Sequence, residues 1–169
     1  HQRRYYDAAH DTTYLNVDIP LAAHTERKVA AGALAFEGRD FTLVFQLAYA
    51  GKRTDDLRAA YLVLETTYPP NEPGDRLSGV RHIGLGADPY EYAYDRSDYK
   101  TGTASQSGAA GRDAPALRRE IAVFKIELED LQHIADATRL ELKLGAETYT
   151  IKSPQIADLR HVLATGDKP

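Results

Sequence analysis

The feature that most constrains the fold is a two-residue hydrophobic period in two separate parts of the chain. In segment 41–50 every second residue is large and apolar: Phe41, Leu43, Phe45, Leu47 and Tyr49. In segment 138–144, apolar and charged residues alternate: Leu140, Leu142 and Leu144 against Arg139, Glu141 and Lys143. Successive side chains of a β-strand point to opposite faces, so this period predicts strands. The charged alternates predict a sheet with one face in water.

Other segments carry weaker strand patterns. We predict further strands at 12–18, about 29–37, 60–67, 80–85, 89–95, 122–128 and 147–151. The polar connection 51–58 between two strands is typical of an antiparallel pair. Gly145-Ala146 predicts a tight type II′ turn in a second antiparallel pair.

Two helices are predicted in the last third of the chain, at about 129–137 and 154–164. The first follows from the helical spacing of Leu131, Ile134 and Ala135. Ser153-Pro154 predicts the start of the second helix, with the serine as its cap, and Gly166 predicts its end. The expected fold class is therefore α+β, a mainly antiparallel β-sheet packed by two helices.

The chain has 169 residues, the size of one domain, so we expect a single α+β domain over 12–166. Residues 1–11 are polar without a sustained period, and we expect a flexible N-terminal segment there. Segment 101–116 is rich in small residues and predicts a long mobile loop.

Composition excludes several classes of protein. The chain has no cysteine, which excludes disulfides, thiol catalysis and cysteine-ligated metals. No apolar run approaches the roughly 20 residues of a transmembrane helix, so we expect a soluble domain. The net charge is −4, and the basic pairs Arg3-Arg4 and Arg118-Arg119 have acidic residues nearby, so we expect no nucleic-acid partner.

The start of the chain at His1 and its lack of methionine leave three explanations: a removed leader, an excised fragment, or residues left from expression. We expect an exported protein of the cell envelope, periplasmic or secreted, with a cytoplasmic protein as the alternative.

The segment Asp88–Asp98 is the best candidate for a binding site because it combines tyrosines and carboxylates. The predicted ligand-binding residues are Tyr90, Tyr92, Tyr94, Glu91, Asp95 and Asp98. On a strand the three tyrosines share one face and Glu91 points to the other. They would form a platform for a sugar or peptide, or else cover the edge of the core and hydrogen-bond at their tips. We favour the second interpretation.

No motif indicates catalysis, a cofactor or a metal. His133 and Asp136 share a helix face, but zinc needs at least three protein ligands. We interpret the pair as part of the solvent-facing side of the helix. Gly84-x-Gly86 lacks the third glycine and the following helix of a dinucleotide site, and no nucleophile motif of the G-x-S-x-G type occurs. We predict no catalytic residue, no cofactor and no metal site.

We therefore expect a non-catalytic binding or structural module whose ligand is an unknown protein or a carbohydrate. The alternative is a small hydrolase or sugar-handling enzyme that uses the carboxylates and tyrosines of segment 88–98, gated by the loop 101–116. A third hypothesis is self-association through an uncovered edge strand.

Overall fold

The computed structural model describes residues 2–21, 26–29, 41–72, 76–104 and 116–165. The N-terminal strands are β1 (Gln2–Asp7), β2 (Thr12–Pro20), β3 (Glu26–Val29), β4 (Phe41–Ala50) and β5 (Leu57–Tyr68). The middle of the chain forms β6 (His82–Ala87), β7 (Tyr90–Ala104) and β8 (Leu117–Ile126). The last third forms α2 (Leu128–Asp136), β9 (Arg139–Leu144), β10 (Glu147–Lys152) and α3 (Ser153–Thr165).

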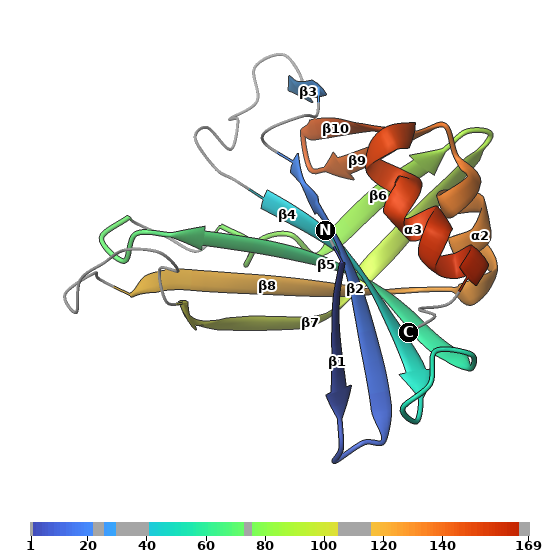
Figure 1. Ribbon diagram of the computed structural model, residues 1–169. Helices are drawn as coiled ribbons and strands as arrows, with labels where there is room; N and C mark the ends of the chain where they lie inside the picture. Colours follow the sequence, from blue (N-terminus) through green and yellow to red (C-terminus); the bar gives the residue numbers. More distant parts are fainter. Residues whose placement is uncertain (1, 22–25, 30–40, 73–75, 105–115, 166–169) are drawn as a thin grey trace.

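The ten strands of the described residues form one antiparallel sheet with the order β1-β2-β4-β5-β8-β7-β6-β9-β10-β3. Helix α3 packs against α2 and contacts both β10 and β2. In a flat sheet these two strands, seven spacings apart in this order, would be separated by about 34 Å. A single helix is only about 10 Å wide, so the sheet must curl around α3. Figure 1 shows this curl, with α2 and α3 side by side against one face.

The core fills the concave face that the two helices cover. A row of directly opposed residues crosses four strands at its centre: Val17, Phe45, Leu62 and Phe124, all 0% exposed. The helices contribute residues that are just as buried, among them Ile134 and Leu159. Burial of one face explains the two-residue period of the sequence. The predicted α+β class, with a mainly antiparallel sheet and two helices near the C-terminus, is confirmed.

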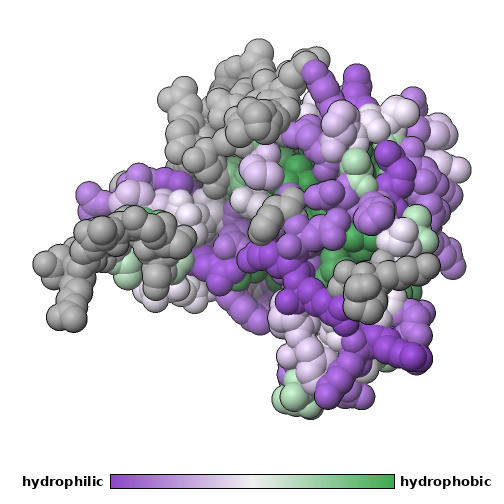
Figure 2. Space-filling model, in the orientation of Figure 1, coloured by the Kyte–Doolittle hydropathy of each residue, from purple (hydrophilic) through white to green (hydrophobic). Residues whose placement is uncertain are grey.

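The outer face of the sheet carries polar side chains around a small apolar centre. Val44, Val63 and Val123 lie directly opposite one another on β4, β5 and β8. They line a shallow depression of about 440 Å³ whose rim includes Arg3 and Tyr5 of β1. In the view of Figure 2, hydrophilic residues predominate on the described surface and hydrophobic ones show as limited areas between them.

Two predictions about irregular segments are corrected by the strands. The flexible segment expected over 1–11 is wrong, because Gln2–Asp7 forms β1 and pairs with Val17–Thr12 of β2. Its residues are mostly exposed, so no hydrophobic period indicated a strand. The loop expected over 101–116 begins too early, because 101–104 belongs to β7 and pairs with β8. The remainder of that loop, 105–115, lies outside the described residues.

Of the strand expected at about 29–37, only Val29 is described, as the last residue of β3, and residues 30–37 lie outside the described residues. The two predicted helices are present at Leu128–Asp136 and Ser153–Thr165. The cap of α3 differs from the prediction: the Oε1 atom of Gln155 accepts a hydrogen bond from the N–H of Lys152 at 2.9 Å, while Ser153 Oγ accepts from Arg160. Gly166 lies outside the described residues.

Candidate functional site

The three tyrosines of the predicted site form a ladder along β7 that holds helix α2. Their rings stack in sequence, with centroids 6.2 Å apart for Tyr90 and Tyr92 and 6.1 Å apart for Tyr92 and Tyr94. Tyr94 donates a hydrogen bond to Asp130 of α2 at 2.9 Å, and Tyr92 Oη lies 2.9 Å from His133 Nδ1. Burial first, and then the bond to Asp130, raise the pKa of Tyr94 far above its usual range.

The tyrosine at the exposed end of the ladder is in a different position. Tyr90 is 44% exposed, and its ring stacks on the imidazole of His133 with centroids 4.0 Å apart. The hydroxyl groups of Tyr92 and Tyr94 therefore hydrogen-bond to helix α2, as expected if these tyrosines cover the edge of the core. Tyr90 is the member of the ladder that lines a cavity.

The carboxylates of the predicted site do not lie with the tyrosines. Glu91 pairs with Lys143 at 3.2 Å, Asp95 with His82 at 2.5 Å, and Asp98 with Lys100 at 3.1 Å. All three carboxylates are exposed and each lies against a separate cationic group or imidazole. His82 is exposed at the start of β6.

Two cavities flank the short pairing between β6 and β9, and we call them together the β6–β9 groove. The two strands pair over only three positions, Gly84–Gly86 opposite Lys143–Glu141, and separate at both ends. Gly84 and Gly86 allow a close approach of the two strands here, because an added Cβ at Gly84 would lie 3.2 Å from Cβ of Lys143. Lys143 forms an ion pair with Glu91 of β7 beside these glycines. A cavity opens at each end of the paired stretch.

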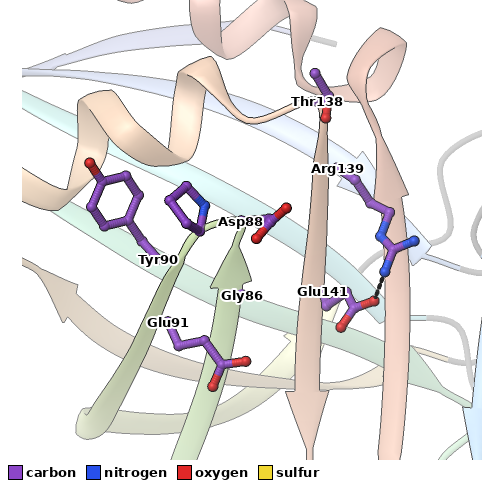
Figure 3. A pocket seen from close by; sticks show the side chains of 8 residues that line it. Gly86, Asp88, Tyr90, Glu91, Thr138, Arg139 and Glu141 are labelled. Carbon is purple, nitrogen blue, oxygen red and sulfur yellow. Dashed lines mark hydrogen bonds and ion pairs between the residues drawn. The ribbon is translucent and has the colours of Figure 1, made fainter.

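The first cavity, here called the Asp88 cavity, lies between the β6–β7 turn and the start of β9. It has a volume of about 530 Å³. Figure 3 shows Asp88 between the turn and β9, with Tyr90 on one side and Arg139 and Glu141 on the other. Arg139 is hydrogen-bonded to Glu141, whereas no ion pair joins Asp88 to another described residue. Thr138 adds a hydroxyl at the opposite rim.

The second cavity, here called the Arg81 cavity, lies at the other end of the groove and is larger, about 700 Å³. Its lining combines Arg81, His82 and Lys143 with the small residues Gly79 and Gly145. The two ends of the groove thus differ in charge: carboxylates predominate in the Asp88 cavity, and cationic side chains predominate in the Arg81 cavity.

One wall of the Arg81 cavity is fixed by a buried carboxylate. Glu120 of β8 is 1% exposed and accepts hydrogen bonds from the backbone N–H groups of Arg76 at 2.7 Å and Leu77 at 3.0 Å. The hydroxyl of Tyr99 donates a third bond at 2.6 Å. We call these contacts the Glu120 anchor. A carboxylate forms stronger hydrogen bonds with backbone N–H groups than a neutral acceptor does. The Glu120 anchor therefore fixes the backbone path of segment 76–81.

A second side chain holds the same segment from β7. The guanidinium of Arg96 donates to the carbonyl oxygens of Leu77, Ser78 and Val80 at 3.2, 2.8 and 3.3 Å, and its plane lies over the ring of Tyr99. The wall of the cavity is therefore built by charged groups from β7 and β8 rather than by apolar packing alone.

Other candidates from the sequence are kept apart by the structure. His133 contacts Tyr92, and Asp136 accepts a hydrogen bond from Gln132, so the two side chains do not meet at one point. Within the described ranges no group of three or more His, Asp and Glu side chains could hold a metal ion. Of the helices described, none has both the length and the apolar character needed to cross a lipid bilayer.

Comparisons with protein-family models, with curated proteins and with solved structures find no match for this chain. The site must therefore be interpreted from its own geometry. Sequence reasoning missed Asp88, Arg139 and Glu141 as neighbours of Tyr90, since the β6–β9 pairing that brings them together joins segments over fifty residues apart. The signal that could have indicated the groove is Gly84-x-Gly86, two glycines on one face of a strand.

Proposed function

We propose that this protein is a non-catalytic binding module whose ligand is a carbohydrate held in the Asp88 cavity. The observation that carries the proposal is the cavity itself, which is lined by an exposed aromatic ring, a guanidinium, a hydroxyl and a carboxylate that has no ion pair among the described residues. Its volume of about 530 Å³ falls within the range of small-molecule sites.

The chemistry of the lining favours a polyhydroxylated ligand. Carboxylates only accept hydrogen bonds, a guanidinium only donates them, and a hydroxyl group does both. A sugar can therefore satisfy Asp88, Arg139 and Thr138 together. Tyr90 adds an apolar ring with a polar tip, which suits the mixed surface of a sugar.

The three carboxylates predicted from the sequence favour binding rather than hydrolysis. A glycosidase needs two carboxyl groups on either side of one bond, and its acid is usually kept protonated by burial. Glu91, Asp95 and Asp98 are instead exposed and face separate partners. The hydrolase alternative stays a prediction, and release of sugar from a bound oligosaccharide would establish it.

The experiment is a screen of immobilised oligosaccharides, followed by calorimetric titration with any that bind. We expect Asp88→Asn and Tyr90→Ala to weaken binding by about tenfold or more, because each removes a direct contact worth roughly 1.4 kcal/mol. Asp98→Asn is the matched control, since Asp98 is an exposed carboxylate of the same segment outside the cavity. Equal affinity in Asp88→Asn and the wild-type protein would contradict the proposal.

For location we propose the cell envelope. The absence of cysteine is compatible with an oxidising compartment, where no thiol is left to react, and extracellular carbohydrate would be accessible there. Fractionation of cells that express the full-length gene tests this, and recovery of the protein from the cytoplasm alone would contradict it.

A further inference from the structure

Strand β1 forms one edge of the sheet and lies in an arm, with β2, that projects away from the helices in Figure 1. In the described part of the chain β1 pairs with β2 alone, so its other side presents backbone N–H and C=O groups without a strand partner. Such an edge can pair with another strand unless its side chains prevent it. The side chains of β1 are exposed at nearly every position, with Tyr5 at 48% and Tyr6 at 38%.

We propose that β1 pairs antiparallel with β1 of a second copy of this chain, with Tyr5 opposite Tyr5 on the twofold axis. This surface is separate from the Asp88 cavity, and the proposal does not depend on the ligand.

Backbone geometry restricts the register of such a pair. In an antiparallel strand, alternate residues direct both backbone hydrogen-bonding groups to the same side. Residues whose groups point outward on one copy must therefore meet outward-pointing residues of the other. In a symmetric pair this condition holds only if the twofold axis passes through a residue, and not between two residues. The axis can accordingly pass through Arg4, Tyr5 or Tyr6.

Side-chain charge selects among these registers. An axis through Arg4 places two arginines directly opposite each other, which is destabilising. An axis through Tyr6 leaves fewer residues in the pair, because the strand ends at Asp7. An axis through Tyr5 places Arg3 opposite Asp7 of the second copy, and places Arg4 opposite Tyr6. Both contacts occur twice by symmetry, as two ion pairs on one face and two cation–π pairs on the other.

The groups needed for the ion pairs stay partly exposed in the single chain, while Arg4 already donates to the carbonyl oxygen of Lys52 at 2.8 Å and Nζ of Lys52 lies 5.4 Å from the centroid of the Tyr6 ring. Arg3 pairs with Asp18 through Nε at 2.8 Å and one terminal nitrogen at 2.9 Å, while its side chain stays 48% exposed. A guanidinium has five N–H donors, so donors remain for a second carboxylate. The carboxylate of Asp7 is 31% exposed beside His10 and still has accepting positions. Charge complementarity thus supports a second copy as the occupant of this edge.

The chain contains no cysteine, so single cysteine variants test the register directly. Directly opposed residues of antiparallel strands have Cα atoms about 4.5–5.5 Å apart, within the range of a disulfide. We expect Tyr5→Cys to form a covalent dimer under mild oxidation. Arg4→Cys and Tyr6→Cys are the matched controls, because each would lie diagonal to its own copy and should cross-link about tenfold more slowly or less.

Sedimentation of the protein without cysteine tests the association itself. A six-residue strand pair is smaller than a standard interface, so we expect a weak dimer that grows with protein concentration. Tyr5→Arg should abolish it, since two cations would meet on the axis, whereas the control Asp55→Asn changes net charge equally in an exposed loop and should not. Faster cross-linking at position 4 or 6, or a monomer at every concentration with no cross-link at position 5, would overturn the proposal.

Discussion

Replacing Glu120 with alanine should destabilise the protein more than most single substitutions. The carboxylate is 1% exposed and accepts bonds from two backbone N–H groups and from the hydroxyl of Tyr99. Each hydrogen bond to a charged group contributes about 1.5–3 kcal/mol, and these contributions do not simply add. Breaking a buried charged network typically costs about 3–5 kcal/mol. We therefore expect Glu120→Ala to lower the free energy of unfolding by about 3–5 kcal/mol.

Glu120→Gln separates the shape of this residue from its charge. Glutamine keeps the volume but offers one accepting oxygen, and its amide nitrogen would face the donors of Arg76 and Leu77. We expect a loss of about 1.5–3 kcal/mol, between the wild-type protein and the alanine variant. Urea denaturation followed by far-UV circular dichroism at neutral pH measures both variants.

The pH dependence supplies a second test of the same contact. Burial alone would raise the pKa of Glu120, but the hydrogen bonds from Tyr99 and from the backbone of Arg76 and Leu77 outweigh burial and hold it below the ordinary value of 4.5. The folded protein then binds fewer protons than the unfolded chain in the window between the two values. The stabilisation is present above 4.5 and is lost as the pH falls through the folded pKa.

The difference in stability between the wild-type protein and Glu120→Gln should therefore be largest near neutral pH and shrink below 4.5. Amide hydrogen exchange should accelerate at both Arg76 and Leu77 in Glu120→Ala, and at one of them at least in Glu120→Gln, because alanine removes both accepting oxygens and glutamine removes one. A cost for Glu120→Ala below about 1 kcal/mol, or a pH-independent difference, would refute the reasoning.

Three further substitutions test the core, the tyrosine ladder and the hydrogen bonds from Arg96 to segment 76–81. Leu62→Ala creates a cavity at a fully buried position and should cost about 2–5 kcal/mol in urea denaturation; a cost below 1 kcal/mol would contradict its central place. Tyr94→Phe removes the hydrogen bond to Asp130 and should lower the free energy of unfolding by about 1 kcal/mol. Unchanged stability and unchanged hydrogen exchange of the α2 amides would show that this bond is unimportant. Arg96→Met removes three bonds to carbonyl oxygens, and we expect a loss of about 1–3 kcal/mol together with faster exchange in segment 76–81, whereas unaltered exchange there would contradict its role.

The parts of the fold that sequence predicted are those whose pattern is set by burial of one face. The alternation at Phe41–Tyr49 and Leu140–Leu144 corresponds to strands β4 and β9, because every second side chain lies in the core. Helix α2 was predictable for the same reason, since Leu131, Ile134 and Ala135 are its buried residues.

Elements whose formation depends on a distant partner were missed. Strand β1 has no buried face, so its extended form follows from pairing with β2 and not from its own pattern. The end of β7 likewise consists of small and polar residues that resemble a loop, and it is a strand because it pairs with Leu117–Glu120 of β8.

The candidate site also contains a part that the sequence predicted and a part that it did not. Alternation correctly placed Tyr90, Tyr92 and Tyr94 on one face of β7 and Glu91 on the other. The residues that surround Tyr90 in the Asp88 cavity could not be predicted, because they come from the separation of β6 and β9. Neither a motif nor a local pattern encodes where two distant strands stop pairing.

The position of the helices explains why binding surfaces are expected on the outside of this sheet. A curved sheet can hold a ligand in its concave face, but here α2 and α3 occupy that face and bury residues such as Ile134 and Leu159 completely. Among the described residues, the β6–β9 groove is open on the outside of the sheet, and the edge strand β1 lies six positions away from β6 in the order of the sheet. Pairing at β1 would leave the Asp88 cavity of each copy open. A dimer of this kind would carry two carbohydrate sites, so a repeating polysaccharide should bind it more tightly than a single oligosaccharide unit does.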